Sequence, residues 1–232
     1  MTGVRAKVEA IESCPVERDE ALGDLRFRAL LGPAAWGMLP PAIRARFGHR
    51  LRGGAAVTYV GRIVESRATR AGALLAQVAR LIGGPLPIGR EREVAAVVTV
   101  TEDAAGDGQF WTRMYGRARG VPQVIHSSKR FAGPTGMEEY LGRGFGIALV
   151  ARARADRLCF LSDHYFVRVG SWRLRLPELL SPGALHIAHV DRPDGGFAFE
   201  LTLRHPRLGE LIHQRGEFRE HRAPDIKEIG ND

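Results

Sequence analysis

Residues 185–218 read LHIAHVDRPDGGFAFELTLRHPRLGELIHQRGEF, three apolar stretches separated by two turn signals. The first turn is PDGG (193–196). The second is HPRLG (205–209), in which Pro206 presets φ for a turn and Gly209 can adopt a positive φ. Strands joined by turns this short are antiparallel neighbours. The segment predicts an antiparallel meander, and we interpret its second half first as a structural hairpin and only second as a ligand wall.

Strand signals also dominate the chain before this segment. The candidate strands are rich in β-branched and aromatic residues, and Gly, Pro and Asp separate them. Together they predict about eight strands. The upstream strand candidates lie at 55–66, 91–103, 109–116, 120–131, 144–154 and 157–169.

Helical patterns are fewer. In RAGALLAQVARLIGG (70–84) the apolar residues recur at i, i+3, i+4 and i+7, and two glycines end the run. This spacing predicts a helix over about residues 71–82 whose packing face is formed by Leu74, Leu75, Val78, Leu81 and Ile82. Shorter helical pieces are predicted within 25–32, 36–48 and, more briefly, 134–142, where Glu138 and Glu139 would lie on a solvated face.

These elements predict the α+β class: one large curved antiparallel sheet, open or half-closed into a barrel, with two or three helices. The helix at 71–82 would pack on the concave side of the sheet. We expect a polar leader at residues 1–20, a single α+β domain at 21–222 and a polar tail at 223–232.

The composition excludes several classes of protein. The chain has 232 residues, a net charge of +8 and 44% apolar residues, which suits a globular protein. Its arginines are scattered and no nucleic-acid motif is present, so we expect no specific nucleic-acid partner. No apolar run is long enough for a membrane span, and the first residues lack the apolar core of a signal peptide. We therefore expect a cytoplasmic protein in which Cys14 and Cys159 are free thiols.

Cofactor and metal motifs are not recognisable either. GRGFGIALV (142–150) spaces its glycines as G-x-G-x-G and opens a strand, whereas a phosphate-binding turn opens a helix. We interpret these glycines as a bend or bulge. His186 and His189 are three apart on a strand and would face opposite ways. His205 and His213 flank a turn without accompanying carboxylates. We predict no cofactor and no metal.

The most suggestive stretch is QFWTRMYG (109–116). On a strand, Trp111, Arg113 and Tyr115 share one face. A buried guanidinium needs an anionic partner, which is either an internal carboxylate or the acidic group of a ligand. If the three side chains face outward, they form a surface ladder and imply no ligand. The sequence leaves these alternatives open.

The motifs in their order resemble a bacterial family. Those that carry the resemblance are LPPAIR (39–44), LPIGRE (86–91), WTRMYG (111–116), the glycine-rich strand, LRLPELL (174–180) and the closing FAF…HPRLGELIHQRGEF. Over roughly residues 25–220 the chain resembles domain-of-unknown-function family 4166. Members of that family stand alone or follow a saccharopine-dehydrogenase-like NAD(P)-binding domain, which implies a partner in small-molecule or lipid metabolism. The family implies no established activity, and Gln214 stands where it implies an aromatic residue.

Three functional hypotheses follow. The first is non-catalytic binding of a hydrophobic or amphipathic acidic small molecule between sheet and helix, with Arg113 meeting the acidic group. The second is an enzyme of small-molecule or lipid metabolism, with a histidine as acid or base. The third is an accessory domain that docks a dehydrogenase-like protein. The predicted pocket residues are Trp111, Arg113, Tyr115, Phe145, Phe197 and Phe199, and the candidate histidines are His126, His205 and His213.

Overall fold

The computed structural model describes residues 24–84, 86–88 and 90–221. The predicted leader (1–20), the predicted tail (223–232) and Cys14 lie outside these residues, so the domain limits 21–222 stay a prediction. Cys159 is a buried free thiol.

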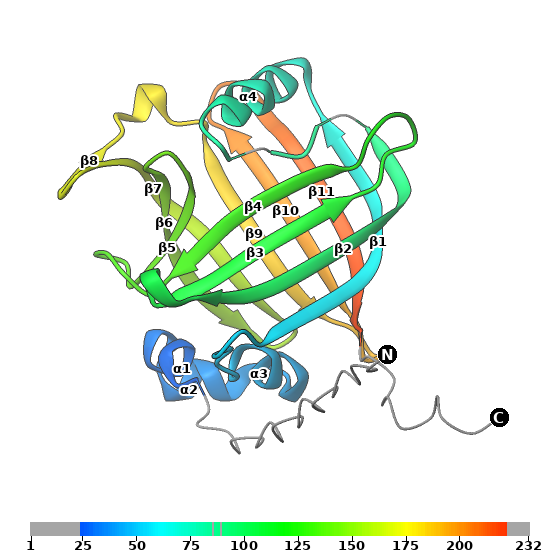
Figure 1. The fold of residues 1–232 in the computed structure, drawn as a ribbon, viewed down its shortest axis with the longest axis vertical. Coiled ribbons are helices and arrows are strands. Elements are labelled where there is room, and N and C mark those ends of the chain that lie inside the picture. The colour runs from blue at the N-terminus through cyan, green and yellow to red at the C-terminus, as the bar shows by residue number, and fades with distance from the viewer. Residues whose placement is uncertain (1–23, 85, 89, 222–232) are drawn as a thin grey trace, which may run out of the picture.

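Ten strands form a closed antiparallel barrel (Figure 1). Around the barrel the order is β6-β5-β4-β3-β2-β1-β11-β10-β9-β7, and β7 pairs again with β6. Among the described residues, the remaining strand, β8, pairs only with residues 166–169 of β7. The strands are β1 (Ala56–Ala68), β2 (Glu91–Asp103), β3 (Gly108–Tyr115), β4 (Gln123–Arg130), β5 (Met137–Gly142), β6 (Phe145–Arg154), β7 (Arg157–Val169), β8 (Trp172–Arg175), β9 (Ala184–Asp191), β10 (Phe197–His205) and β11 (Gly209–Glu220).

The predicted α+β fold, with an open or half-closed sheet, is therefore wrong. Local turn signals correctly identify hairpins such as β9–β10 and β10–β11. Closure depends on pairing between distant strands, above all β1 with β11, in which Tyr59 lies opposite Glu220 and Ala68 opposite Ile212. Alternation within one strand carries no information on such a partner.

Three short helices close one end of the barrel (Figure 1). They are α1 (Arg26–Leu31), α2 (Pro33–Met38) and α3 (Pro41–Phe47). Phe27, Ile43 and Phe47 are buried from these helices into the core, and the Phe27 and Phe47 rings meet edge to face at 5.0 Å. Burial of such aromatic and aliphatic side chains is the main contribution that holds the helices in place.

The helix α4 (Arg70–Leu81) lies across the opposite end (Figure 1). Its bounds agree with the prediction, but it covers an opening of the barrel instead of a concave face. Its small residues, Gly72, Ala76 and Ala79, point inward, whereas Leu74, Val78 and Leu81 of the predicted packing face are exposed.

The first turn of α4 is fixed to β11. The Thr69 amide donates to the Leu211 carbonyl at 2.9 Å, and the Thr69 hydroxyl accepts from the Gly72 amide at 3.1 Å as an N-cap. A Cβ on Gly72 would lie 2.1 Å from the Leu211 carbonyl oxygen. Only glycine allows the helix to approach this closely.

The predicted short helix within 134–142 is wrong, because Met137–Gly142 forms the strand β5 between β4 and β6. The register shift between Tyr140 and Gly142 agrees with the bulge expected from the glycines. Glu138 and Glu139 are both buried instead of solvated. Pairing with two neighbouring strands has overridden a weak local preference for helix.

Glu138 points to the outer side of the barrel wall, where β8 covers it. It forms an ion pair with Arg173 of β8 and accepts a hydrogen bond of 2.8 Å from the Tyr140 hydroxyl. The Arg173 guanidinium also lies 3.8 Å from the centroid of the buried Phe166 ring. These contacts hold the base of β8 against the barrel.

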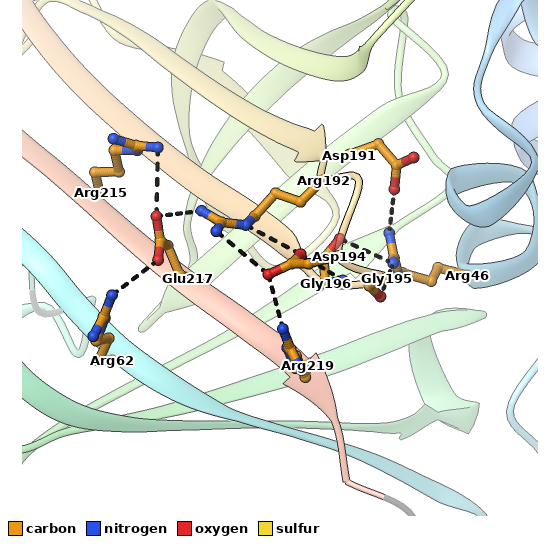
Figure 2. A network of polar contacts seen from close by, with 10 residues as sticks. All are labelled: Arg46, Arg62, Asp191, Arg192, Asp194, Gly195, Gly196, Arg215, Glu217 and Arg219. Carbon is orange, nitrogen blue, oxygen red and sulfur yellow. Dashed lines mark hydrogen bonds and ion pairs between the residues drawn. The ribbon is translucent and has the colours of Figure 1, made fainter.

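The outer wall near the β9–β10 turn carries a network of paired charges (Figure 2). Glu217 of β11 forms ion pairs with Arg62, Arg192 and Arg215, and Asp194 pairs with Arg192 and Arg219. The arginines of this face are thus each matched to a carboxylate. No helix of the described residues is both long enough and apolar enough to cross a membrane.

Candidate functional site

A cavity of about 280 Å³ lies inside the barrel beneath α4. Its walls are mostly apolar and include Leu75 and Ala79 of α4, Ile147 of β6, and Phe199 and Leu201 of β10. Small-molecule sites commonly have volumes of roughly 300–1,000 Å³, so this cavity suits a small ligand.

Polar side chains gather on one wall of this cavity, on the neighbouring strands β3, β4 and β5. Arg113 of β3 donates through Nη1 to the Ser127 hydroxyl at 3.1 Å, and Ser127 donates to Glu139 Oε1 at 2.7 Å. Arg113 Nη2 also lies 3.5 Å from Glu139 Oε1. Arg113 and Glu139 are only 7% and 4% exposed, so their interaction is weakly screened by water.

Lys129 adds a second basic group just below the cavity. It lies opposite Glu139 across β4 and β5, with Nζ 3.1 Å from Oε2. The ammonium also lies 5.1 Å from the Trp111 ring centroid and 5.7 Å from that of Phe160. Burial lowers the pKa of Lys129, and Glu139 only partly opposes this effect.

Glu139 is ionised in this setting. Burial alone would raise its pKa, but Lys129, Arg113 and the hydrogen bond from Ser127 outweigh that effect and lower the pKa to about 2. One carboxylate therefore serves two basic side chains, Arg113 and Lys129, and the wall carries an excess of basic groups.

Neutral polar groups line the cavity on this wall and on the strands β7 and β11. Gln214 is buried and lines the cavity, and its Oε1 has no hydrogen-bond partner among the residues that the structure describes. Burial raises the pKa of Tyr115 to about 12, although Arg113 opposes the effect, and burial also raises the pKa of Tyr165. Both phenols line the cavity and keep their protons at neutral pH. The site can thus offer hydroxyl donors and an amide beside a guanidinium.

The model of one protein family, described as domain of unknown function (DUF4166), matches residues 39–218. The match takes in α3, α4 and all the strands up to Phe218 of β11, and so the whole cavity. The chain belongs to this family. The resemblance read from the motifs is confirmed. No curated protein matches the chain.

In this DUF4166 domain the question raised by the WTRMYG stretch has an answer. Trp111, Arg113 and Tyr115 face the interior, and Arg113 has the internal carboxylate partner Glu139 while it also borders the cavity. Of the nine residues predicted for the site, the side chains of Arg113, Tyr115, Phe145 and Phe199 line the cavity. Whether they bind a ligand stays a prediction.

Two predicted aromatic residues lie elsewhere in the DUF4166 barrel. Trp111 packs between the two halves of the core, and its buried Nε1 has no hydrogen-bond partner within the described residues. Phe197 lies in the core below the cavity, where it stacks on His189 with ring centroids 4.0 Å apart.

The three candidate histidines do not converge on the cavity. His126 borders it only through its place on β4, because its ring is exposed, stacks on Phe110 and lies 2.8 Å from the Thr112 hydroxyl. The His205 ring accepts from the Arg207 and Leu208 amides in the β10–β11 turn. His213 lies on the outer side of β11, 3.2 Å from the Thr202 hydroxyl. His186 is exposed and His189 buried, as the strand alternation predicts.

Five polar residues of the site were missed from the sequence: Ser127, Lys129, Glu139, Tyr165 and Gln214. The residues Ile125, Ser127 and Lys129 are two apart from one another, so they share one face of β4. The predicted strand at 120–131 was therefore enough to place Ser127 and Lys129 on the same face. Glu139 could not be placed on that wall while residues 134–142 were interpreted as a helix.

A larger hollow of about 590 Å³ lies outside the barrel near the start of α4. It is bordered mainly by exposed charges that neutralise each other, such as Arg67 and Glu210 at 3.0 Å. Exposed pairs of this kind exchange readily with water. The interior cavity is the better candidate because most of its polar side chains are buried. Within the described ranges, no three His, Cys, Asp or Glu side chains are grouped so that they could hold a metal ion.

Proposed function

We propose that this protein binds a small amphipathic anion in the cavity without converting it chemically. The apolar part of the ligand lies among Leu75, Phe199 and Leu201, and its acidic group meets Arg113. The observation that carries the proposal is the buried guanidinium of Arg113 on the wall of a mostly apolar cavity, since its carboxylate partner is shared with Lys129 just below. Glu139 alone faces both Arg113 and Lys129.

Burial of the Arg113 guanidinium favours binding of a further anionic group. A buried guanidinium that is only partly neutralised gains from a further acceptor, because charge-assisted hydrogen bonds in a dry site are strong. Hydrogen bonds to charged groups contribute roughly 1.5–3 kcal/mol each. Tyr115 and the unpartnered amide of Gln214 lie on the same cavity and can hold further polar atoms of the ligand.

The binding function is favoured over the two alternatives by particular observations. For an enzyme we expected two histidines and a carboxylate to converge beside Arg113. The carboxylate of Glu139 lies there, but the rings of His126, His205 and His213 lie elsewhere. For a pure accessory domain we expected a filled core without a cavity together with an exposed apolar patch. An open volume lies beneath α4, although α4 does carry exposed apolar side chains. A cytoplasmic location and a dehydrogenase-like partner stay predictions from the sequence.

The test compares two ligands that differ in charge. Isothermal titration calorimetry measures the affinity of the protein for decanoate and for decanol. We expect decanoate to bind more tightly, and Arg113→Gln to weaken decanoate binding by roughly 10- to 100-fold while decanol binding changes little. The matched control is Arg152→Gln, which removes an exposed arginine on the outer wall.

Equal affinities for decanoate and decanol, or unchanged decanoate affinity in folded Arg113→Gln protein, would contradict the proposal. Native mass spectrometry of protein purified from its own host then identifies the retained molecule. We expect an acidic, largely apolar compound that the Arg113→Gln variant no longer retains.

A further inference from the structure

The outer face of α4 is apolar, which is unusual for a helix at the surface of a barrel. Leu74, Val78 and Leu81 occupy one face at i, i+4 and i+7, and they are 68%, 51% and 72% exposed. The inward face holds the small residues that fit against β11. These three large side chains thus contact water, whereas Leu75 of the same helix packs against the core and lines the cavity.

A second apolar segment lies across the cavity from α4. The short 3-10 helix η2 (Glu178–Leu180) follows β8, and the two form an arm that projects from the barrel wall beside the α4 end (Figure 1). Leu179 and Leu180 are 84% and 66% exposed. Val78 and Leu180 are exposed and also line the cavity. The exposed apolar side chains therefore frame the mouth of the cavity.

The charges around this mouth are mostly basic, with Glu178 of η2 as an acidic exception. The chain from Arg67 to Arg90 contains four arginines and no acidic residue. Arg70 and Arg80 flank the apolar face of α4, Arg143 occupies the β5–β6 turn next to Gly83, and Arg175 immediately precedes the cavity residue Leu176. None of these four has an ion-pair partner in the part of the chain that the structure describes.

The outer wall near the β9–β10 turn differs from the mouth in how its arginines are paired. On the face drawn in Figure 2, arginines are held by Asp191, Asp194 and Glu217. At the mouth, exposed leucines alternate with free guanidinium groups. Apolar side chains bordered by free cations are the pattern of a surface that lies in the interface of a bilayer containing anionic lipids.

We propose that the cavity mouth docks on an anionic lipid bilayer. Leu74, Leu81 and Leu179 enter the boundary between headgroups and acyl chains, and Arg70, Arg80, Arg143 and Arg175 contact lipid phosphates. In this position the cavity opens toward the acyl chains. The docking itself needs no ligand. If the protein binds an amphipathic anion as proposed above, the bilayer is the source of that ligand, and this part of the inference rests on the proposed function.

A second copy of this chain is the competing occupant, and the charges argue against it. A two-fold symmetric contact places the same patch on both partners, so free arginines would face free arginines. An anionic surface neutralises them instead, and each arginine close to it contributes roughly a fivefold gain in affinity.

The test is co-sedimentation with vesicles of phosphatidylcholine, alone or mixed in equal amounts with phosphatidylglycerol. We expect binding to the mixed vesicles that is weakened by salt. The double variant Leu74→Glu/Leu81→Glu should lose more than roughly tenfold in affinity. Its control is Leu25→Glu, since Leu25 is 65% exposed at the α1 end of the barrel.

A second pair of variants tests the charges. Arg70→Gln/Arg80→Gln should reduce binding to mixed vesicles by roughly 20- to 30-fold, while Arg152→Gln/Arg154→Gln on the outer wall should not. Circular dichroism verifies that each variant is folded. Decanoate titration without vesicles measures ligand binding separately, so failure of one proposal is distinguishable from failure of the other.

Two results would overturn the docking proposal. One is equal sedimentation of the wild type and the Leu74→Glu/Leu81→Glu variant. The other is a concentration-dependent dimer in analytical ultracentrifugation that this same variant abolishes, because a second copy would then cover the face.

Discussion

Lys129 and Glu139 face each other inside the barrel, with Nζ 3.1 Å from Oε2. Glu139 is also the internal partner of Arg113, so Glu139→Gln leaves two basic side chains buried without a carboxylate. Removing one partner of a buried ion pair costs roughly 3–5 kcal/mol. We expect a loss of that size in the free energy of unfolding, measured by urea denaturation at pH 7.

Two comparisons make this prediction specific. Lys129→Met added to Glu139→Gln should recover part of the loss, because one of the two uncompensated charges is removed while Arg113 remains. Glu217→Gln, on the partly exposed outer wall, should cost less than about 1 kcal/mol. A Glu139→Gln protein as stable as the Glu217→Gln protein would contradict the argument.

Acid should destabilise the protein in a manner set by His189. Burial, reinforced by Arg46, lowers the pKa of His189 to about 3, and its Nε2 lies 3.3 Å from the Arg46 guanidinium, from which it accepts. The folded pKa lies below the unfolded value of about 6.5, so the unfolded chain takes up this proton first as the pH falls. The stabilisation is present above about pH 6.5 and is lost toward pH 3, at about 1.4 kcal/mol per pH unit.

Urea denaturation between pH 7 and pH 5 isolates this effect. The contribution of Glu139 begins to decline only below its unfolded pKa of about 4.5, as its own folded pKa is lowered to about 2. His189→Gln should flatten the profile above pH 5, whereas His126→Gln, whose ring lies outside the barrel, should not. An unchanged slope in His189→Gln protein would rule out His189 as the source.

Gln214→Leu should stabilise the unliganded protein. Its Oε1 is buried without a hydrogen-bond partner, and replacing an unsatisfied polar group by an apolar side chain of similar size removes a cost of roughly 1 kcal/mol. Thermal unfolding measures the gain. Gln77→Leu, on the exposed face of α4, is the control and should be close to neutral. A marked loss of stability in Gln214→Leu protein would indicate that the amide has a structural partner.

Gly72→Ala should displace α4, because the added Cβ meets the Leu211 carbonyl oxygen. Overpacking of this kind costs about 1–3 kcal/mol. The matched control is Gly37→Ala in α2, where a Cβ meets no atom within 4 Å and the substitution should be neutral or stabilising by up to about 1 kcal/mol. Urea denaturation compares the two variants, and equal stabilities would show that α4 is not fixed through Gly72.

The sequence predicted local structure better than long-range structure. The hairpins around residues 193–196 and 205–209, the helix α4 and the shared strand face of Trp111, Arg113 and Tyr115 were accessible from alternation and turn chemistry, whereas the sequence left open whether that face points inward. Closure was not, because the pairing of β6 with β7 and of β1 with β11 depends on twist and register summed over the whole sheet.

The site was predictable only in part for the same reason. Arg113, Tyr115, Phe145 and Phe199 were found because large or charged side chains on one strand face attract attention. Glu139 was missed because the wall exists only when β5 lies beside β4. The apolar stripe of α4 was interpreted as a packing face, although Leu74 and Leu81 face solvent, since periodicity gives the direction of a stripe but not what covers it.

The pairing of β1 with β11 also has a kinetic consequence. Ala68 lies beside Ile212, so the ring cannot be completed until the last strand has arrived beside the first. Contacts between residues so far apart in sequence are formed late, and folding of such topologies is slow. We expect refolding to pass through a curved intermediate in which the edge of β1 is not yet paired with β11. The lifetime of this intermediate then sets how much chaperone protection the nascent protein requires.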